Sequence, residues 1–128
     1  MRTIFFGLLV ILLVFCFFGC DNGSSPSSTP DPYGINGTWV RNLGPVRIIF
    51  SNLEFLYQRN GPSWENYCKG TFTLNEAKTQ ITFSNMQLWN NSGWESYAYV
   101  ETDTIAISGN TLSLNGDSWP GTGTYIRQ

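Results

Sequence analysis

The sequence predicts an all-β domain, a small antiparallel up-and-down β-barrel, with a two-sheet β-sandwich as the alternative. From Gly37 onward, apolar and polar residues alternate with a period of two, and no window has the spacing of an amphipathic helix. Turn residues recur every eight to twelve positions and separate the alternating segments. Consecutive hairpins of this size close into a barrel or stack as a sandwich, because both arrangements protect exposed strand edges.

The predicted strands are short alternating or apolar segments. In chain order they are Thr38–Arg41, Val46–Phe50, Leu53–Arg59, Tyr67–Leu74, Gln80–Phe83, Met86–Trp89, Trp94–Val100, Thr104–Ser108, Thr111–Leu114 and Gly123–Arg127. In the second of them, Val46, Ile48 and Phe50 share one face. In the later ones Thr, Ser and Lys fill the positions between apolar residues, which is typical of sheets with one face in water.

The turn residues support this order of strands. Residues 109–110 (Gly-Asn), between Ile107 and Leu112, are a strong hairpin signal. Residues 60–62 (Asn-Gly-Pro) and 91–93 (Asn-Ser-Gly) mark wider loops. We therefore expect a meander in which strands that are neighbours in the sequence pair with each other.

The sequence also contains a short internal repeat, which we call the internal echo. Residues 48–53 (IIFSNL) match residues 81–86 (ITFSNM), and residues 64–67 (WENY) match residues 94–97 (WESY). The Phe-Ser-Asn-Leu/Met spacing keeps both apolar residues on one face across a two-residue turn or a bulge. Either similar hairpins have converged on similar sequences, or a duplicated unit places two Trp-Glu-x-Tyr clusters symmetrically.

Composition limits the functions that the chain can have. At 128 residues it is long enough for one small domain and too short for two. Seven Lys and Arg against nine Asp and Glu give a net charge of −2, which disfavours a nucleic-acid-binding face. The chain has no histidine, the commonest general base and transition-metal ligand. We therefore expect a protein that is not an enzyme, with no catalytic residues, no metal site and no cofactor.

Two further features could carry chemistry but have simpler interpretations. Glu65 and Glu95 occupy equivalent places in the echo and could suggest a glycosidase pair, yet exposed glutamates beside loops are ordinary. Cys68 is the one cysteine inside the expected domain, and we interpret it as a small apolar residue on a strand rather than a reactive thiol.

Residues 1–19 are predicted to be an export signal. A short basic start (Met-Arg) precedes an apolar run over residues 4–18, which is shorter than a membrane span. The run ends at Phe17-Phe18-Gly19-Cys20, which resembles the lipobox of bacterial lipoproteins, in a loose form similar to that of spirochaetes. The resemblance implies cleavage before Cys20 and attachment of acyl chains such as palmitate to that residue.

Residues 20–36 are predicted to be the lipidated Cys20 followed by a flexible tether. The segment 21–36 is rich in Ser, Pro, Gly and Asn and has almost nothing to bury. A tether of this kind lets a domain over residues 37–128 stand clear of the lipid headgroups, while two or three acyl chains hold it firmly. We expect a cell-envelope protein, anchored to the inner or outer membrane, with its domain outside the cytoplasm.

Two short motifs at the ends of the expected domain resemble a known pattern. Residues 37–39 (Gly-Thr-Trp) open the first strand, and residues 123–127 (Gly-Thr-Tyr-Ile-Arg) form the last. This pair is similar to the calycin pattern of lipocalins and fatty-acid-binding proteins, and the domain looks like the short lipocalin-like domains of bacterial lipoproteins. The resemblance implies that Trp39 plugs one barrel end and that Arg127 packs over it and caps backbone carbonyls.

Aromatic residues concentrate around the two wide loops, and the candidates for ligand contact are Trp64, Tyr67, Trp89, Trp94, Tyr97 and Tyr99. They could line a mouth or patch that stacks on sugars, aromatic molecules or lipid tails, or they could be core and rim residues of a small domain. The favoured expectation is a non-catalytic barrel that binds a small apolar or aromatic ligand. The alternative is a module that contacts a protein or a glycan, such as a surface adhesin or a periplasmic inhibitor, with a filled barrel and no cargo.

Overall fold

The computed structural model describes residues 31, 33–116 and 122–128, and this part of the chain is built from β-strands. The strands are β1 (Gly37–Arg41), β2 (Val46–Ser51), β3 (Glu54–Asn60), β4 (Trp64–Leu74), β5 (Gln80–Trp89), β6 (Trp94–Ser96), β7 (Glu101–Ser108), β8 (Thr111–Asn115) and β9 (Gly123–Arg127). Within these ranges, no helix has the length and apolar character that a membrane span requires. The predicted signal over residues 1–19 and the lipid-bearing Cys20 lie outside the described residues.

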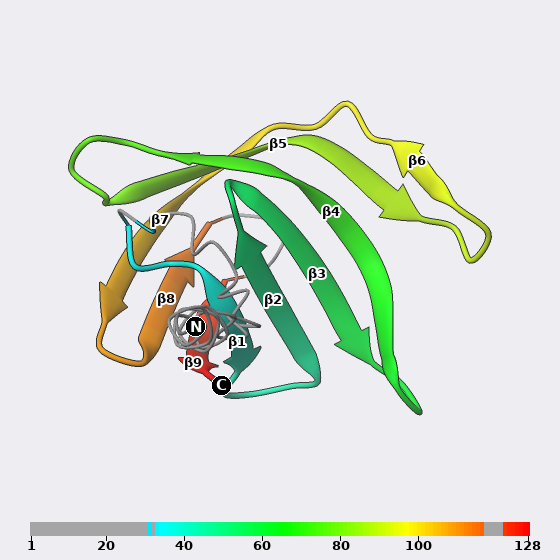
Figure 1. The fold of residues 1–128 in the computed structure, drawn as a ribbon, viewed down its shortest axis with the longest axis horizontal. Coiled ribbons are helices and arrows are strands. Elements are labelled where there is room, and N and C mark those ends of the chain that lie inside the picture. The colour runs from blue at the N-terminus through cyan, green and yellow to red at the C-terminus, as the bar shows by residue number, and fades with distance from the viewer. Residues whose placement is uncertain (1–30, 32, 117–121) are drawn as a thin grey trace, which may run out of the picture.

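The strands form a closed antiparallel barrel. Strands β1 to β5 pair in chain order, β5 pairs with β7, and β7, β8 and β9 follow in turn. The pairing of β9 with β1 closes the sheet, so eight strands surround the core and β6 is an extra strand (Figure 1). This arrangement confirms the predicted all-β up-and-down barrel and excludes the two-sheet sandwich.

Strand β5 differs from the prediction in a way that shapes the outer surface. The two strands expected over 80–83 and 86–89 form one continuous strand, because a bulge at Asn85 lets pairing with β4 continue past the interruption. Of the strand expected over residues 94–100, only residues 94–96 form a strand, which is β6 and pairs with β5. The chain leaves the edge of β5 after Tyr97, whose backbone N–H still donates to the Met86 carbonyl at 2.7 Å, and it returns as β7, so β6 and β7 lie in succession along the same edge. In Figure 1 the β5–β6 hairpin extends beyond the barrel.

The barrel interior is filled by side chains of its own strands. Inward positions alternate with outward ones as the period-two pattern predicts, and the buried residues form one continuous apolar cluster. Phenylalanine rings meet edge to face inside it, with centroids 5.1 Å apart for Phe50 and Phe72 and 4.9 Å apart for Phe55 and Phe83. The barrel therefore belongs to the class that packs its interior with side chains.

The two copies of the internal echo adopt different local structures, a turn in the first and a bulge in the second. Asn52 and Asn85 both have a left-handed backbone with φ of 51°. Asn52 begins a two-residue turn between β2 and β3, whereas Asn85 is the bulge within β5. Across the bulge, Phe83 and Met86 are both buried, as expected, but Leu53 at the turn is half exposed. The shared apolar face therefore occurs only in the second copy.

The segment before β1 belongs to the barrel rather than to the tether. Ile35 is 1% exposed and is part of the core cluster. The Asp31 carboxylate fixes the approach to it by accepting hydrogen bonds from the backbone N–H groups of Tyr33, Ile35 and Asn36 at 3.3, 3.2 and 2.8 Å. Part of the segment that the sequence places in the tether therefore packs against the barrel, since Ile35 is buried in the core and Tyr33 packs against it.

Candidate functional site

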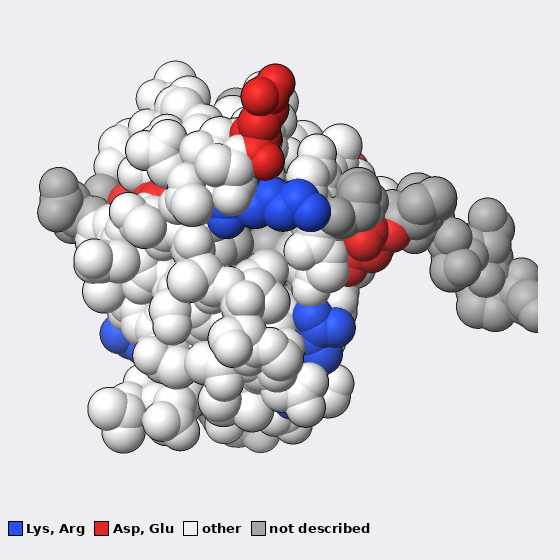
Figure 2. All heavy atoms as spheres, turned by 90° about the vertical axis from the view of Figure 1, so that its left-hand side faces the viewer, with Lys and Arg blue, Asp and Glu red and all other residues white. Residues whose placement is uncertain are grey.

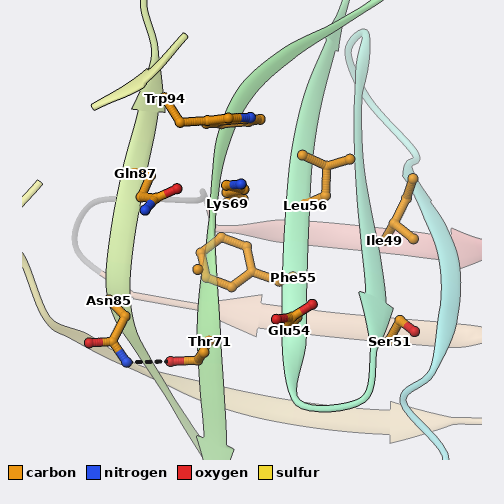
Figure 3. A pocket seen from close by; sticks show the side chains of 11 residues that line it. Ile49, Ser51, Glu54, Phe55, Leu56, Lys69, Thr71, Asn85, Gln87 and Trp94 are labelled. Atoms are coloured by element: carbon orange, nitrogen blue, oxygen red, sulfur yellow. Dashed lines mark hydrogen bonds between the residues drawn. The ribbon is translucent and has the colours of Figure 1, made fainter. Parts of the chain in front are cut away.

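A pocket of about 520 Å³ lies on the outer face of the barrel, where β2 to β6 form a curved sheet. We call it the outer-face pocket, and its lining residues are Ile49, Ser51, Glu54, Phe55, Leu56, Lys69, Gly70, Thr71, Asn85, Gln87 and Trp94. Figure 3 shows Trp94 and Lys69 at one end of it, and Asn85 and Thr71 at the other. Its size lies in the range of small-molecule sites in proteins.

Strand register brings the central lining residues into one row. Ile49 pairs with Leu56, Leu56 with Lys69, and Lys69 with Gln87, so four successive strands each contribute one side chain. These positions alternate with buried ones along their strands, and the row therefore faces outward. The row thus has two apolar side chains at one end, Ile49 and Leu56, and an ammonium group and an amide at the other, Lys69 and Gln87.

Gly70 lines the pocket at the point where the pairing between β4 and β5 shifts register. A Cβ atom at this position would lie 2.6 Å from the Ser84 carbonyl oxygen and 2.9 Å from Cε1 of Phe55. A side chain there would collide with the backbone, so glycine is required by close approach. The buried Phe55 ring packs against Gly70 from the neighbouring strand and forms part of the pocket floor.

Polar groups fill the end of the pocket beside the bulge. The Asn85 side-chain amide donates a hydrogen bond to the Thr71 hydroxyl at 3.0 Å, which orients both groups (Figure 3). The Thr71 hydroxyl also lies 3.1 Å from the Ser84 hydroxyl. Glu54 is exposed and lies directly across from Thr71 in the strand register. This end therefore offers amide, hydroxyl and carboxylate groups to a ligand.

The other end has an aromatic wall. The Trp94 ring meets the Trp89 ring edge to face across the β5–β6 hairpin, with centroids 5.2 Å apart. The ammonium nitrogen of Lys69 lies 4.6 Å from the centroid of the Trp94 ring, a cation–π contact. Trp94 is thus held from two sides, and Lys69 is held in the pocket by the ring.

A second tryptophan–cation pair lies outside the pocket on the same stretch of strands. The Arg47 guanidinium lies 4.3 Å from the centroid of the Trp64 ring. Arg47 also donates a hydrogen bond to the Gln58 side-chain oxygen at 2.7 Å, and the Gln58 amide donates to Asn66 at 2.9 Å. Both tryptophans of the echo therefore carry a cation, but their surroundings differ.

The remaining predicted contact residues are not brought together at the pocket. Tyr67 is partly buried against the core, 6.0 Å from the ring of Tyr57, and Tyr99 also packs on the core. Tyr97 is 47% exposed and its ring lies 5.6 Å from that of Tyr99. Of the six aromatic residues proposed from the sequence, Trp94 alone lines the outer-face pocket.

The residues of the two calycin-like motifs lie together where β1 pairs with β9. Trp39 and Arg127 are cross-strand neighbours, and the guanidinium lies 4.4 Å from the centroid of the indole ring. The fully buried indole N–H donates to the Ile35 carbonyl at 2.7 Å, and Arg127 donates to the Gly34 carbonyl. These contacts join β1, β9 and the segment before β1 at one place.

The described residues offer little that could serve nucleophilic or metal chemistry. Cys68 is fully buried on β4, and burial raises the pKa of its thiol to about 12, so the reactive thiolate is scarce at neutral pH. No group of three or more Cys, Asp or Glu side chains in the described ranges could hold a metal ion.

The charge distribution agrees with this description. Charged residues make up 12% of the sequence. On the face shown in Figure 2, uncharged side chains cover most of the surface and the charged ones form small, separate groups. Such a face gives a polyanion no continuous basic strip to follow.

A scan of this chain against protein-family models, a search of curated proteins and a search of solved structures each gave no match. The fold and the pocket therefore define the protein only as a closed, filled eight-stranded barrel with a pocket on its outer wall.

Proposed function

We propose that this protein is a membrane-anchored, non-catalytic module of the bacterial cell envelope that binds a glycan in the outer-face pocket. The observation that carries the proposal is the position and lining of this pocket: it is concave, lies outside the filled barrel, and combines a tryptophan wall with amide, hydroxyl and carboxylate groups. In this proposal the lipocalin-like resemblance concerns the barrel fold alone, because the ligand binds to the outer wall of the barrel and not to its interior.

The anchor rests on the sequence, in which an apolar segment ends at Cys20 and is followed by residues typical of a tether. Metabolic labelling with palmitate is expected to mark the protein in its host and to be lost in Cys20→Ser. Once the signal is cleaved, the variant is also expected to leave the membrane fraction, because it has lost the acyl chains that would hold the mature protein on the bilayer. Unchanged labelling and membrane association in Cys20→Ser would refute the anchor.

An apolar ligand inside the barrel, the favoured expectation from the sequence, has less support than a ligand on the outside. The interior positions are held by the core side chains, including Trp39, Phe50, Phe72 and Phe83 at 0–1% exposure. A ligand in that space would have to displace close-packed rings, at the cost of their contacts. The outer-face pocket needs no such rearrangement.

The lining fits a sugar better than a protein partner. A pyranose ring has an apolar C–H face and a rim of hydroxyl groups, and here Ile49, Leu56 and Trp94 can contact the first. The amides of Asn85 and Gln87 and the Glu54 carboxylate can bind the second, since they include both donors and acceptors. A stable protein partner needs roughly 1,000 Å² or more of buried surface, much more than a pocket of this size supplies.

The test is calorimetric titration of the full chain, held in a detergent without a sugar headgroup, with a panel of neutral and acidic trisaccharides. Binding of at least one is expected, and Trp94→Ala is expected to weaken it tenfold or more by removing the aromatic wall. Trp64→Ala is the matched control, because Trp64 also carries a cation but does not line the pocket.

Two results would contradict the proposal. One is the absence of binding across the whole panel. The other is equal loss of affinity in Trp94→Ala and Trp64→Ala, which would mean that the sugars contact a different surface. Thermal unfolding of both variants, followed by circular dichroism, checks that each remains folded.

A further inference from the structure

We infer that the glycan bound by this protein is an acidic one, and that Lys69 binds its carboxylate group; this inference rests on the proposed glycan-binding function. It concerns the end of the outer-face pocket where Lys69, Gln87 and Trp94 come together (Figure 3).

Among the described residues, Lys69 is the one cation that lines the outer-face pocket. Its nitrogen lies 4.6 Å from the centroid of the Trp94 ring, so the ring shields one side of the ammonium group from water. A ring face satisfies the charge only in part, because the three N–H donors need oxygen acceptors. Within the described ranges, no carboxylate lies within ion-pair distance of Lys69, and no hydrogen bond from its ammonium group occurs.

Arg47 shows that a cation packed on a tryptophan ring can also have a hydrogen-bond acceptor within the protein. Arg47 lies over Trp64 in the same way, but its guanidinium also donates to Gln58, which in turn is bonded to Asn66. The Arg47 pair is thus a structural unit completed within the sheet. The Lys69 pair lacks such an acceptor among the described residues and faces the pocket.

The neighbours of Lys69 suit a carboxylate. Gln87 is its direct cross-strand partner on β5, so the two side chains leave the sheet about 5 Å apart and on the same face. An ammonium and an amide N–H group at this separation can each donate to one oxygen of a carboxylate. Glu54, the acidic lining residue, is opposite Thr71 rather than Lys69 in the register and accepts well from sugar hydroxyls.

The direct test compares sugars that differ only in charge. Trimers of galacturonate, glucuronate and mannuronate are each titrated into the full chain in detergent, beside the corresponding methyl ester, in which the carboxylate is neutral. At least one acid is expected to bind about tenfold more tightly than its ester, because a charge-assisted hydrogen bond is lost on esterification. The preference is expected to shrink as NaCl is raised, since salt screens the pair.

Variants at Lys69 identify the group responsible. Lys69→Met keeps an unbranched apolar side chain against Trp94 and is expected to abolish the preference for acid over ester, because the ammonium group that binds the carboxylate is gone. Lys69→Arg, which keeps the charge, is expected to retain the preference. Circular dichroism melting confirms that each variant is folded.

The outcomes separate this inference from the proposed function. If acids and esters bind equally to the unchanged protein, or if Lys69→Met retains the preference, the inference is wrong and a glycan-binding pocket for neutral sugars remains. If no acid or ester binds, and no neutral trisaccharide either, both the inference and the proposed function are wrong.

Discussion

Trp39→Ala is expected to lower the free energy of unfolding by about 3–5 kcal/mol, the range measured for removal of large buried aromatic side chains. Trp39 is fully buried in the core cluster. Its removal opens a cavity, leaves the Ile35 carbonyl without its donor, and deprives Arg127 of the ring beneath its guanidinium. For a domain of this size the melting temperature should fall by at least about 12 °C.

Urea unfolding followed by far-ultraviolet circular dichroism measures the effect. Trp64→Ala is the control, because it removes a half-buried tryptophan that also contacts a cation. Its expected cost is about 1 kcal/mol, since most of the loss is an exposed cation–π contact and partial burial. Equal destabilisation by the two substitutions would show that Trp39 has no special part in closing the barrel.

The barrel itself could be predicted because its signal is local. Strands such as β2 alternate between buried and outward residues, and the alternation alone distinguishes inside from outside. Turn residues between the segments then make antiparallel neighbours the simplest arrangement. Errors occurred where a single residue overrides the pattern, as at Asn85, where a left-handed backbone joins two expected strands into one.

The outer-face pocket could not be predicted in the same way, because it depends on register. The row of Ile49, Leu56, Lys69 and Gln87 exists only when four strands are aligned to the residue. Alternation marks each of these residues as outward and gives no information on which strand partner it faces. Trp94 was singled out from the sequence because it is aromatic and near a loop, whereas its polar neighbours had no feature that set them apart.

The place of Ile35 was missed for a different reason. It is a single apolar residue in a segment rich in Ser, Pro, Gly and Asn, and composition averaged over that segment is typical of a tether. In the structure the buried Ile35 side chain, the Ile35 carbonyl that Trp39 binds and the Gly34 carbonyl that Arg127 binds join this segment to the barrel. Burial of a single large aliphatic residue can contribute as much stability as a hydrogen-bonded turn.

A chain that begins at Gly37 is therefore expected to be less stable than one that begins at Asp31, by about 3–5 kcal/mol. The shorter chain loses the buried Ile35 side chain, for which truncation to alanine alone costs about 2–5 kcal/mol. It also loses the acceptor of the buried Trp39 indole N–H and the Gly34 carbonyl that Arg127 binds. An unsatisfied buried donor adds a penalty of about 1–3 kcal/mol, which water can partly relieve at the newly opened barrel end.

Urea unfolding of the two chains gives the comparison, and a point substitution in the full chain separates the side chain from the segment. Ile35→Ala should reproduce most of the loss, since it removes the buried methyl groups and keeps the carbonyl in place. Leu43→Ala is the matched aliphatic control, because Leu43 is 82% exposed and its removal should change the free energy of unfolding by less than about 0.5 kcal/mol. If the chain from Gly37 is as stable as the chain from Asp31, residues 33–36 are part of the tether after all, and the barrel end formed by Trp39 and Arg127 is stable without them.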